Sequence, residues 1–77
     1  MNKEVKVEKM HNDEVCNYRV DLFFEYSTYI KKYEVYYPEF WMATNFANSL
    51  KNEDNLINLY ILERASDGEF DITRMIK

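Results

Sequence analysis

Polar and apolar residues alternate along most of this chain, a period of two that is typical of β-strands with one face exposed to water. The alternation stops near the middle, where apolar residues recur every three to four positions, as along one face of an α-helix. The pattern therefore predicts one helix between two sets of strands. We place the helix at Pro38–Asn52 and the strands at Lys3–Met10, Val15–Tyr26, Tyr29–Tyr37, Leu56–Ala65 and the segment after Asp67-Gly68.

The predicted helix begins and ends at residues that suit those positions. Pro38 lacks the N–H group that the first helical turn leaves unpaired, and Glu39 places a negative charge at the positive end of the helix dipole. Asn52 is expected to end the helix as a left-handed cap. The stripe that faces the sheet is Met42, Ala43, Phe46, Ala47 and Leu50, with Phe40 at its margin.

Trp41 projects from the opposite side of this helix, beside Asn45 and Asn48. In a small domain such a side chain can pack under a neighbouring loop, here the one after the helix. Alternatively it anchors a partner, because tryptophan is enriched among the residues that dominate binding energy. The sequence leaves both interpretations open.

Turn signals between the strands predict how they pair. The polar break His11-Asn12-Asp13-Glu14 is typical of a turn, so we expect the first two strands to pair across it. Val7 would then lie opposite Tyr18 and Val5 opposite Val20, which brings apolar faces together. Ser27-Thr28 is expected to lead into a third antiparallel strand.

Asp67-Gly68 is the strongest turn signal in the chain, because a two-residue hairpin loop requires a positive φ that glycine adopts readily. With Ser66 opposite Glu69, opposite charges meet across this hairpin, and so do apolar residues. The expected pairs include Arg64 with Asp71, Ala65 with Phe70 and Leu59 with Ile76.

These elements predict a single α+β domain over residues 1–77: an antiparallel sheet of about five strands in the order β-β-β-α-β-β, with the helix packed on one face. The face under the helix is expected to carry Val5, Val7, Tyr18, Val20, Leu22, Phe24, Tyr33, Val35, Leu59, Ile61, Phe70, Ile72 and Ile76. Because one helix covers one face, the other would expose Phe23, Ile30, Tyr36, Tyr60, Leu62 and Met75. Several such residues together would form a patch that small monomers rarely show to water.

Composition narrows the class of protein. A chain of 77 residues buries only about 60–65% of its unfolded surface, so its folded state is only marginally stable. Domains of this size commonly gain stability by forming oligomers. A net charge of −4 argues against direct binding to nucleic acid. One cysteine fits a reducing compartment, and we expect a cytoplasmic protein with no membrane span and no signal peptide.

Candidate chemistry is sparse. His11 and Cys16 are the only residues of their kinds, and the predicted pairing places Cys16 opposite Lys9 rather than opposite the histidine. Paired carboxylates lie in predicted turns, where no pocket separates their pKa values. One Cys and one His cannot complete a zinc site. We therefore predict no enzymatic activity, no metal and no cofactor.

Seven tyrosines are the one feature that favours a nucleotide or single-stranded nucleic-acid binder, because bases stack on sheet aromatics. Such platforms carry lysine and arginine along the phosphate track, whereas here Asp21, Glu25 and Glu34 intervene. Strand tyrosines more often bury a ring and leave the hydroxyl in water.

In size, acidity and the packing of strands on one helix, the chain resembles phage-encoded inhibitors such as anti-CRISPR proteins and inhibitors of uracil-DNA glycosylase. The resemblance implies a protein that blocks a host enzyme of nucleic-acid processing or defence by steric occupation or partial DNA mimicry. It assigns no residue a role. A non-catalytic regulatory or structural subunit is the alternative.

From the residues themselves we expect a protein partner and a homodimer, formed through the apolar patch or an unpaired edge strand. The candidate partner-binding residues are the apolar Trp41, Phe23, Ile30 and Tyr36 and the acidic Asp13, Glu14, Glu53, Asp54 and Glu69.

Overall fold

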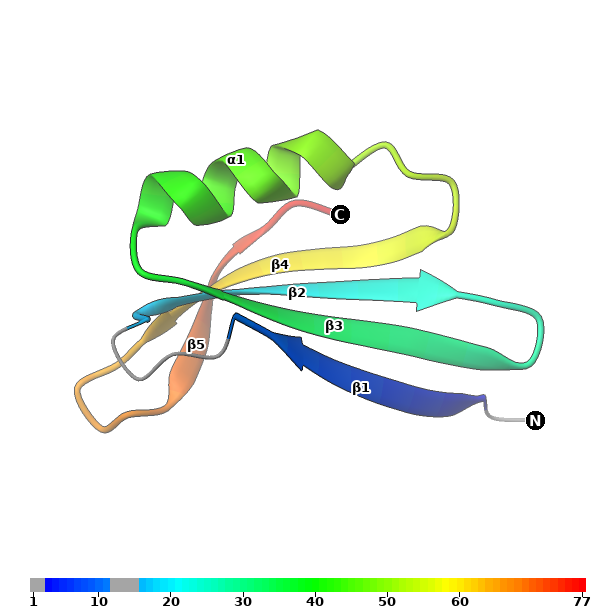
Figure 1. Ribbon diagram of the computed structural model, residues 1–77, viewed down its shortest axis with the longest axis horizontal. Coiled ribbons are helices and arrows are strands. Elements are labelled where there is room, and N and C mark those ends of the chain that lie inside the picture. Colours follow the sequence, from blue (N-terminus) through cyan, green and yellow to red (C-terminus); the bar gives the residue numbers. More distant parts are fainter. Residues whose placement is uncertain (1–2, 12–15) are drawn as a thin grey trace.

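The computed structural model describes residues 3–11 and 16–77, which form a five-stranded sheet with one helix on one face (Figure 1). The predicted helix and all five strands are confirmed as elements. Their bounds are β1 Glu4–Met10, β2 Tyr18–Glu25, β3 Tyr29–Tyr37, α1 Phe40–Leu50, β4 Leu56–Arg64 and β5 Phe70–Met75.

The sheet is mixed, with the strand order β1-β3-β2-β4-β5. β2 and β3 form the predicted antiparallel hairpin across Ser27-Thr28, but β3 then lies between β2 and β1 and pairs with β1 in parallel. The predicted pairing of Val7 with Tyr18 and of Val5 with Val20 is therefore wrong. The predicted turn at residues 12–14 lies outside the described residues.

The apolar content of the strands explains this order. β2 carries apolar side chains on both faces, and it takes the centre of the sheet with a neighbour on each side. β1 alternates valine with charge, and all seven of its residues are exposed. A strand with so little apolar surface gains little from a central position, so it occupies an edge.

β4 and β5 form the predicted antiparallel hairpin, but its loop has three residues instead of two. The N–H of Gly68 donates to the carbonyl of Ala65 at 2.9 Å, and the N–H of Ala65 donates to the carbonyl of Glu69 at 2.7 Å. Gly68 has a φ of 88°, the left-handed geometry that this loop with its bulge requires.

The longer loop shifts the register by one residue near the turn, so Arg64 faces Phe70 and Glu63 faces Asp71. The predicted pairs of Arg64 with Asp71 and of Ala65 with Phe70 are wrong. A second irregularity, which leaves Thr73 unpaired between two ladder pairs, restores the predicted register. Leu59 accordingly accepts a hydrogen bond from the N–H of Ile76 at 2.8 Å.

α1 is shorter than predicted, with Glu39 as its N-cap and Lys51, in right-handed helical geometry, as its C-cap. Asn52 is not a left-handed cap, since His11 is the one non-glycine residue of positive φ in the part of the chain that the structure describes. The predicted stripe is confirmed for Ala43, Phe46, Ala47 and Leu50. Ala43 and Ala47 are fully buried over the sheet, and small side chains there let the helix lie close to β2 and β4.

The core under α1 contains Val20, Leu22, Val35, Leu56, Leu59 and Ile61, with Ala43 and Ala47 from the helix. Four residues predicted for this core lie elsewhere, namely Val5, Val7, Phe70 and Ile72. The parallel pairing of β1 turns the two valines to the opposite face, where they are 49% and 53% exposed. The shifted register of the hairpin does the same for Phe70 and Ile72, because a one-residue slip exchanges the faces of a strand.

Candidate interaction surfaces

The sheet face opposite α1, here called the open face, carries an ion-pair network of four side chains. Arg19 binds Asp21 through two parallel hydrogen bonds of 2.8 and 3.0 Å. Lys32 contacts Glu34 at 2.8 Å and Asp21 at 3.7 Å. The four groups alternate in sign across β2 and β3, and their charges cancel.

This network is largely withdrawn from water, since Asp21 is 4% exposed and Glu34 7%. Burial of a charge is costly unless the charge is paired and hydrogen-bonded. Here the pairing is complete: among the described residues, every buried side-chain nitrogen and oxygen has a hydrogen-bond partner.

The pKa values on this face reflect the pairing. Burial by itself would raise the pKa of Glu34, but the hydrogen bond from Lys32 and the positive charges of Arg19, Lys32 and Lys9 outweigh it and hold the pKa below its ordinary value. Burial would likewise lower the pKa of Arg19, and the hydrogen bonds and charge of Asp21 outweigh it, so that pKa is raised. Both shifts stabilise the charged forms.

Aromatic rings cover a further part of the open face. The ring centroid of Phe70 lies 4.6 Å from the guanidinium of Arg64 and 5.0 Å from that of Arg19, and the ring meets Tyr36 edge-on. Phe23 meets Tyr60 edge-on, with the ammonium of Lys32 5.4 Å from the ring of Phe23. These contacts cover apolar surface with long charged side chains.

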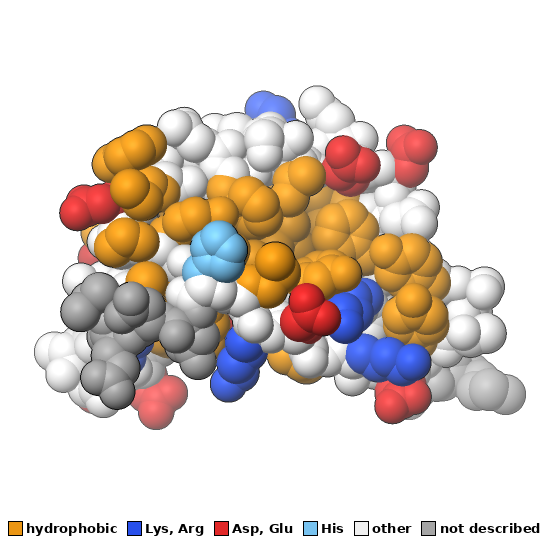
Figure 2. All heavy atoms as spheres, viewed as in Figure 1, with side chains coloured by type: hydrophobic (Ala, Val, Ile, Leu, Met, Phe, Trp, Pro, Cys, Tyr) orange, Lys and Arg blue, Asp and Glu red, His pale blue; other side chains and the backbone are white. Residues whose placement is uncertain are grey.

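A second feature is an apolar groove on the α1 side, with a volume of about 380 Å³. Figure 2 shows it as a hollow among hydrophobic side chains between the helix and β1. It exists because α1 packs over β2, β3 and β4 and leaves β1 uncovered. Its lining consists of Met10, Leu22, Phe24, Tyr33, Val35, Phe46 and Leu50, with Glu8 at the β1 side.

The outer side of α1 carries Trp41, which is 59% exposed, and its flank carries Phe40, which is 39% exposed. Phe40 packs edge-on against Tyr18 and lies under the guanidinium of Arg74, at 5.6 Å. Of the two sequence interpretations of Trp41, the structure contradicts burial under the loop after the helix. The indole presents most of its surface to water.

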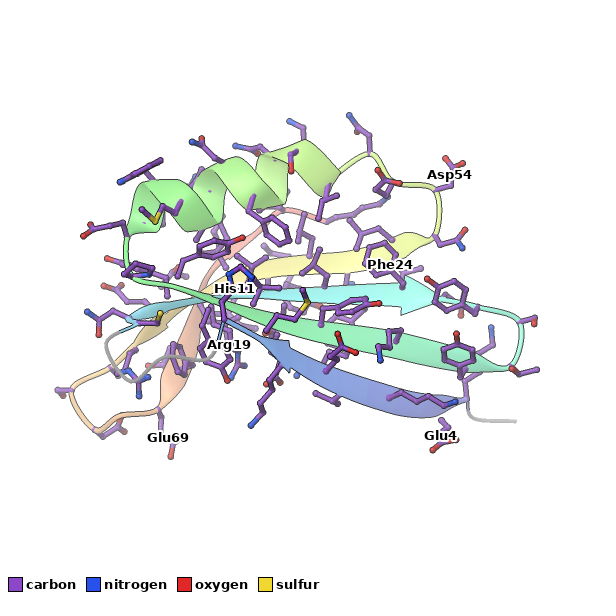
Figure 3. The ribbon with its side chains drawn as sticks, in the orientation of Figure 1. Glu4, His11, Arg19, Phe24, Asp54 and Glu69 are labelled. Carbon is purple, nitrogen blue, oxygen red and sulfur yellow. The ribbon has the colours of Figure 1, made fainter. Side chains whose placement is uncertain are left out.

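The acidic candidates do not form one patch. Glu53 and Asp54 are exposed in the loop between α1 and β4, and Glu69 is exposed in the turn between β4 and β5. Figure 3 shows Asp54 and Glu69 at opposite ends of the molecule. Asp13 and Glu14 lie outside the described residues.

The remaining apolar candidates lie on the open face but are less exposed than predicted. Tyr36 is 6% exposed and Leu62 4%, because Phe70 and Arg19 cover this region. Phe23 and Ile30 are half-buried. Sequence reasoning missed this cover, although the alternation of Arg19 with Asp21 and of Lys32 with Glu34 was the signal that could have revealed it.

The tyrosines do not share a face. Tyr33 packs against the core under α1, together with Tyr18 and Tyr37, whereas Tyr36 and Tyr60 lie on the open face. Burial raises the pKa of Tyr37. A stacking platform for bases would need several of these rings side by side on one surface.

Cys16 is buried, and its thiol lies 3.9 Å from the backbone carbonyl of His11, whose ring lies against that of Tyr37. In the described part of the chain, no cluster of three or more His, Cys, Asp or Glu side chains has a geometry that could hold a metal ion. Nor does that part contain a helix of the length and apolar character needed to cross a membrane.

No protein-family model matches the chain, and no curated protein or solved structure matches it.

Proposed function

We propose that this chain is a small protein-binding module whose partner-facing surface is the outer side of α1. The observation that carries the proposal is the 59% exposure of Trp41, the only tryptophan in the chain. Trp41 is held on a helix whose opposite side is fixed by Ala43 and Ala47, so the indole is presented from a rigid element. Large aromatic side chains placed in this way are the residues that dominate binding energy at protein interfaces.

In its narrower form, the proposal is that the partner is a nucleic-acid-processing or defence enzyme, which the chain inhibits by occupying its surface. The small size and the net negative charge of the chain support this narrower proposal. The distribution of charge favours steric occupation over DNA mimicry, because Asp54 and Glu69 lie at opposite ends of the molecule (Figure 3). A phosphate mimic would need a continuous acidic track.

Affinity capture with a quantitative comparison of variants tests the proposal. A protein retained by the wild-type chain should bind Trp41→Ala at least about 30-fold more weakly, the equivalent of about 2 kcal/mol. Met75→Ala is the matched control, because Met75 is 67% exposed but lies on the open face, paired with Tyr60, on the opposite side of the sheet from α1. Equal binding by both variants would refute the assignment of this surface.

The same captured partner tests the narrower form. If it is an enzyme, its activity should fall as the wild-type chain is added and should not fall with Trp41→Ala at the same concentration. A partner that binds through Trp41 but keeps its full activity would instead indicate a regulatory or structural subunit.

A further inference from the structure

The outer edge of β1 is a second surface with the properties of an interface. β1 pairs with β3 through seven consecutive residue pairs with no shift in register. No strand among the described residues pairs with its other side, and all seven residues are exposed. An unpaired edge presents a row of free N–H and C=O groups to any strand that can align with it.

The two edges of the sheet differ in this respect. β5, at the other edge, has six residues and a bulge at Thr73, a device that bends an edge and prevents another strand from pairing along it. β1 has neither a bulge nor a proline. The edge available for pairing is therefore β1.

We propose that β1 pairs with β1 of a second copy of this chain, antiparallel, about a two-fold axis at Val7. In this register Val7 faces Val7 of the second copy. Lys6 faces Glu8 of the second copy, and Glu8 faces its Lys6. The two sheets become one continuous sheet, with both helices on the same side, because paired residues in antiparallel strands point to the same face.

Charge complementarity selects this register. It places two pairs of opposite charge, Lys6 with Glu8, directly across the interface, where such pairs are stabilising. A shift by two residues in one direction places Lys6 opposite Lys6, and a shift in the other direction places Glu8 opposite Glu8. Like charges directly opposite one another destabilise a strand pair.

Apolar surface supports the same arrangement. Val5 and Val7 lie on the open face and are about half exposed, with Val5 paired to Ile30 on β3. Pairing about Val7 places the two Val7 side chains opposite one another, with each Val5 diagonal to Val7 of the second copy. The outer side of α1 stays accessible, since the helix lies over β2, β3 and β4, so this inference is independent of the proposed function.

Charge-swap variants followed by sedimentation equilibrium test the proposal. The wild-type chain should dimerise, and Lys6→Glu should weaken the dimer at least about tenfold, because both opposite-charge pairs become like-charge pairs. Glu8→Lys should do the same. An equimolar mixture of the two variants should form a heterodimer, since the carboxylate introduced at position 6 of one chain then faces the ammonium introduced at position 8 of the other. Loss of folding cannot produce that result.

Lys51→Glu is the control for net charge, because Lys51 lies at the end of α1 and the substitution changes the charge equally. A wild-type chain that stays monomeric over tens of micromolar would overturn the proposal. So would a dimer that Lys6→Glu and Lys51→Glu weaken to the same extent.

Cross-linking tests the register. Val7→Cys should form a covalent dimer on mild oxidation, because position 7 faces itself, whereas Val5→Cys should not, because position 5 faces Lys9 of the second copy. The parent chain, whose Cys16 is buried, should stay uncross-linked. Faster cross-linking through position 5 than through position 7 would contradict this register.

Discussion

The face of the sheet under α1 and the open face bury their side chains by different means. Under the helix, Leu22, Leu59 and Ile61 are almost fully excluded from water by apolar neighbours. On the open face, Tyr36 and Leu62 are also buried, but beneath a layer of ion pairs and rings contributed by the sheet itself.

The difference shows that a small sheet with a single helix does not need a partner to cover the centre of its second face. Long charged side chains such as Arg19 and Lys32 cover apolar surface with their methylene groups and place their charges against carboxylates. The surfaces that we propose for partners are accordingly the outer side of α1 and the edge of β1, rather than the centre of the open face.

The largest expected effect compares one substitution on the two faces. Ile61→Ala, under α1, should cost about 2–5 kcal/mol of unfolding free energy, because it opens a cavity in a fully packed core. Ile72→Ala, at a 54% exposed site on the open face, should cost less than about 1 kcal/mol. Urea unfolding measures both, and equal costs would contradict the placement of Ile72.

Sequence reasoning predicted the helix, its buried stripe and the five strands, because these depend on local period and turn residues. It failed for the strand order, because which strands become neighbours depends on how well each of them can bury apolar side chains. The turn signal at residues 11–14 favoured pairing of the first two strands, yet β4 takes that place beside β2, and β1 pairs with the other side of β3. β4 offers Leu56, Leu59 and Ile61 to the core, whereas β1 offers only Glu8 and Met10 at the groove.

The candidate interaction surfaces were likewise predicted only where they depend on local structure. The exposure of Trp41 follows from its angle on the helix, which sequence gives directly. The cover over Tyr36 depends on Phe70, whose face was set by a three-residue loop at Gly68 where the sequence suggested a two-residue loop. A shift of one residue was enough to move Phe70 from one face to the other.

Removal of one partner of the ion-pair network is the next largest expected effect. Asp21→Ala should lower the unfolding free energy by about 2–3 kcal/mol, because the partly buried guanidinium of Arg19 then has no carboxylate partner on β2. A double-mutant cycle with Arg19→Ala should show that the two costs are not additive. Additive costs would show that the network contributes nothing as a unit.

Acid should weaken the open face selectively. Because the pKa of Glu34 in the folded chain lies below its ordinary value of 4.5, this carboxylate contributes stability above that pH. The contribution is lost as the pH falls through the lowered pKa. Glu34→Gln should therefore make the fall of the urea midpoint between neutral and acidic pH shallower. An unchanged slope would exclude Glu34 as a source of the acid dependence.

The smallest expected effect on stability is that of Trp41→Ala, which should change the unfolding free energy by less than about 1 kcal/mol, because the side chain is mostly in water. This contrasts with about 3–5 kcal/mol for a tryptophan in a core. Thermal unfolding of the isolated chain distinguishes the two values.

The most direct test of the account is the fluorescence of Trp41 itself, since it is the only tryptophan in the chain. At concentrations where the chain is monomeric, we expect red, water-exposed emission that iodide quenches nearly as well as in the urea-unfolded chain. Addition of the captured partner should shift the emission to the blue and protect it from iodide. Blue, protected emission from the free monomer would contradict the account.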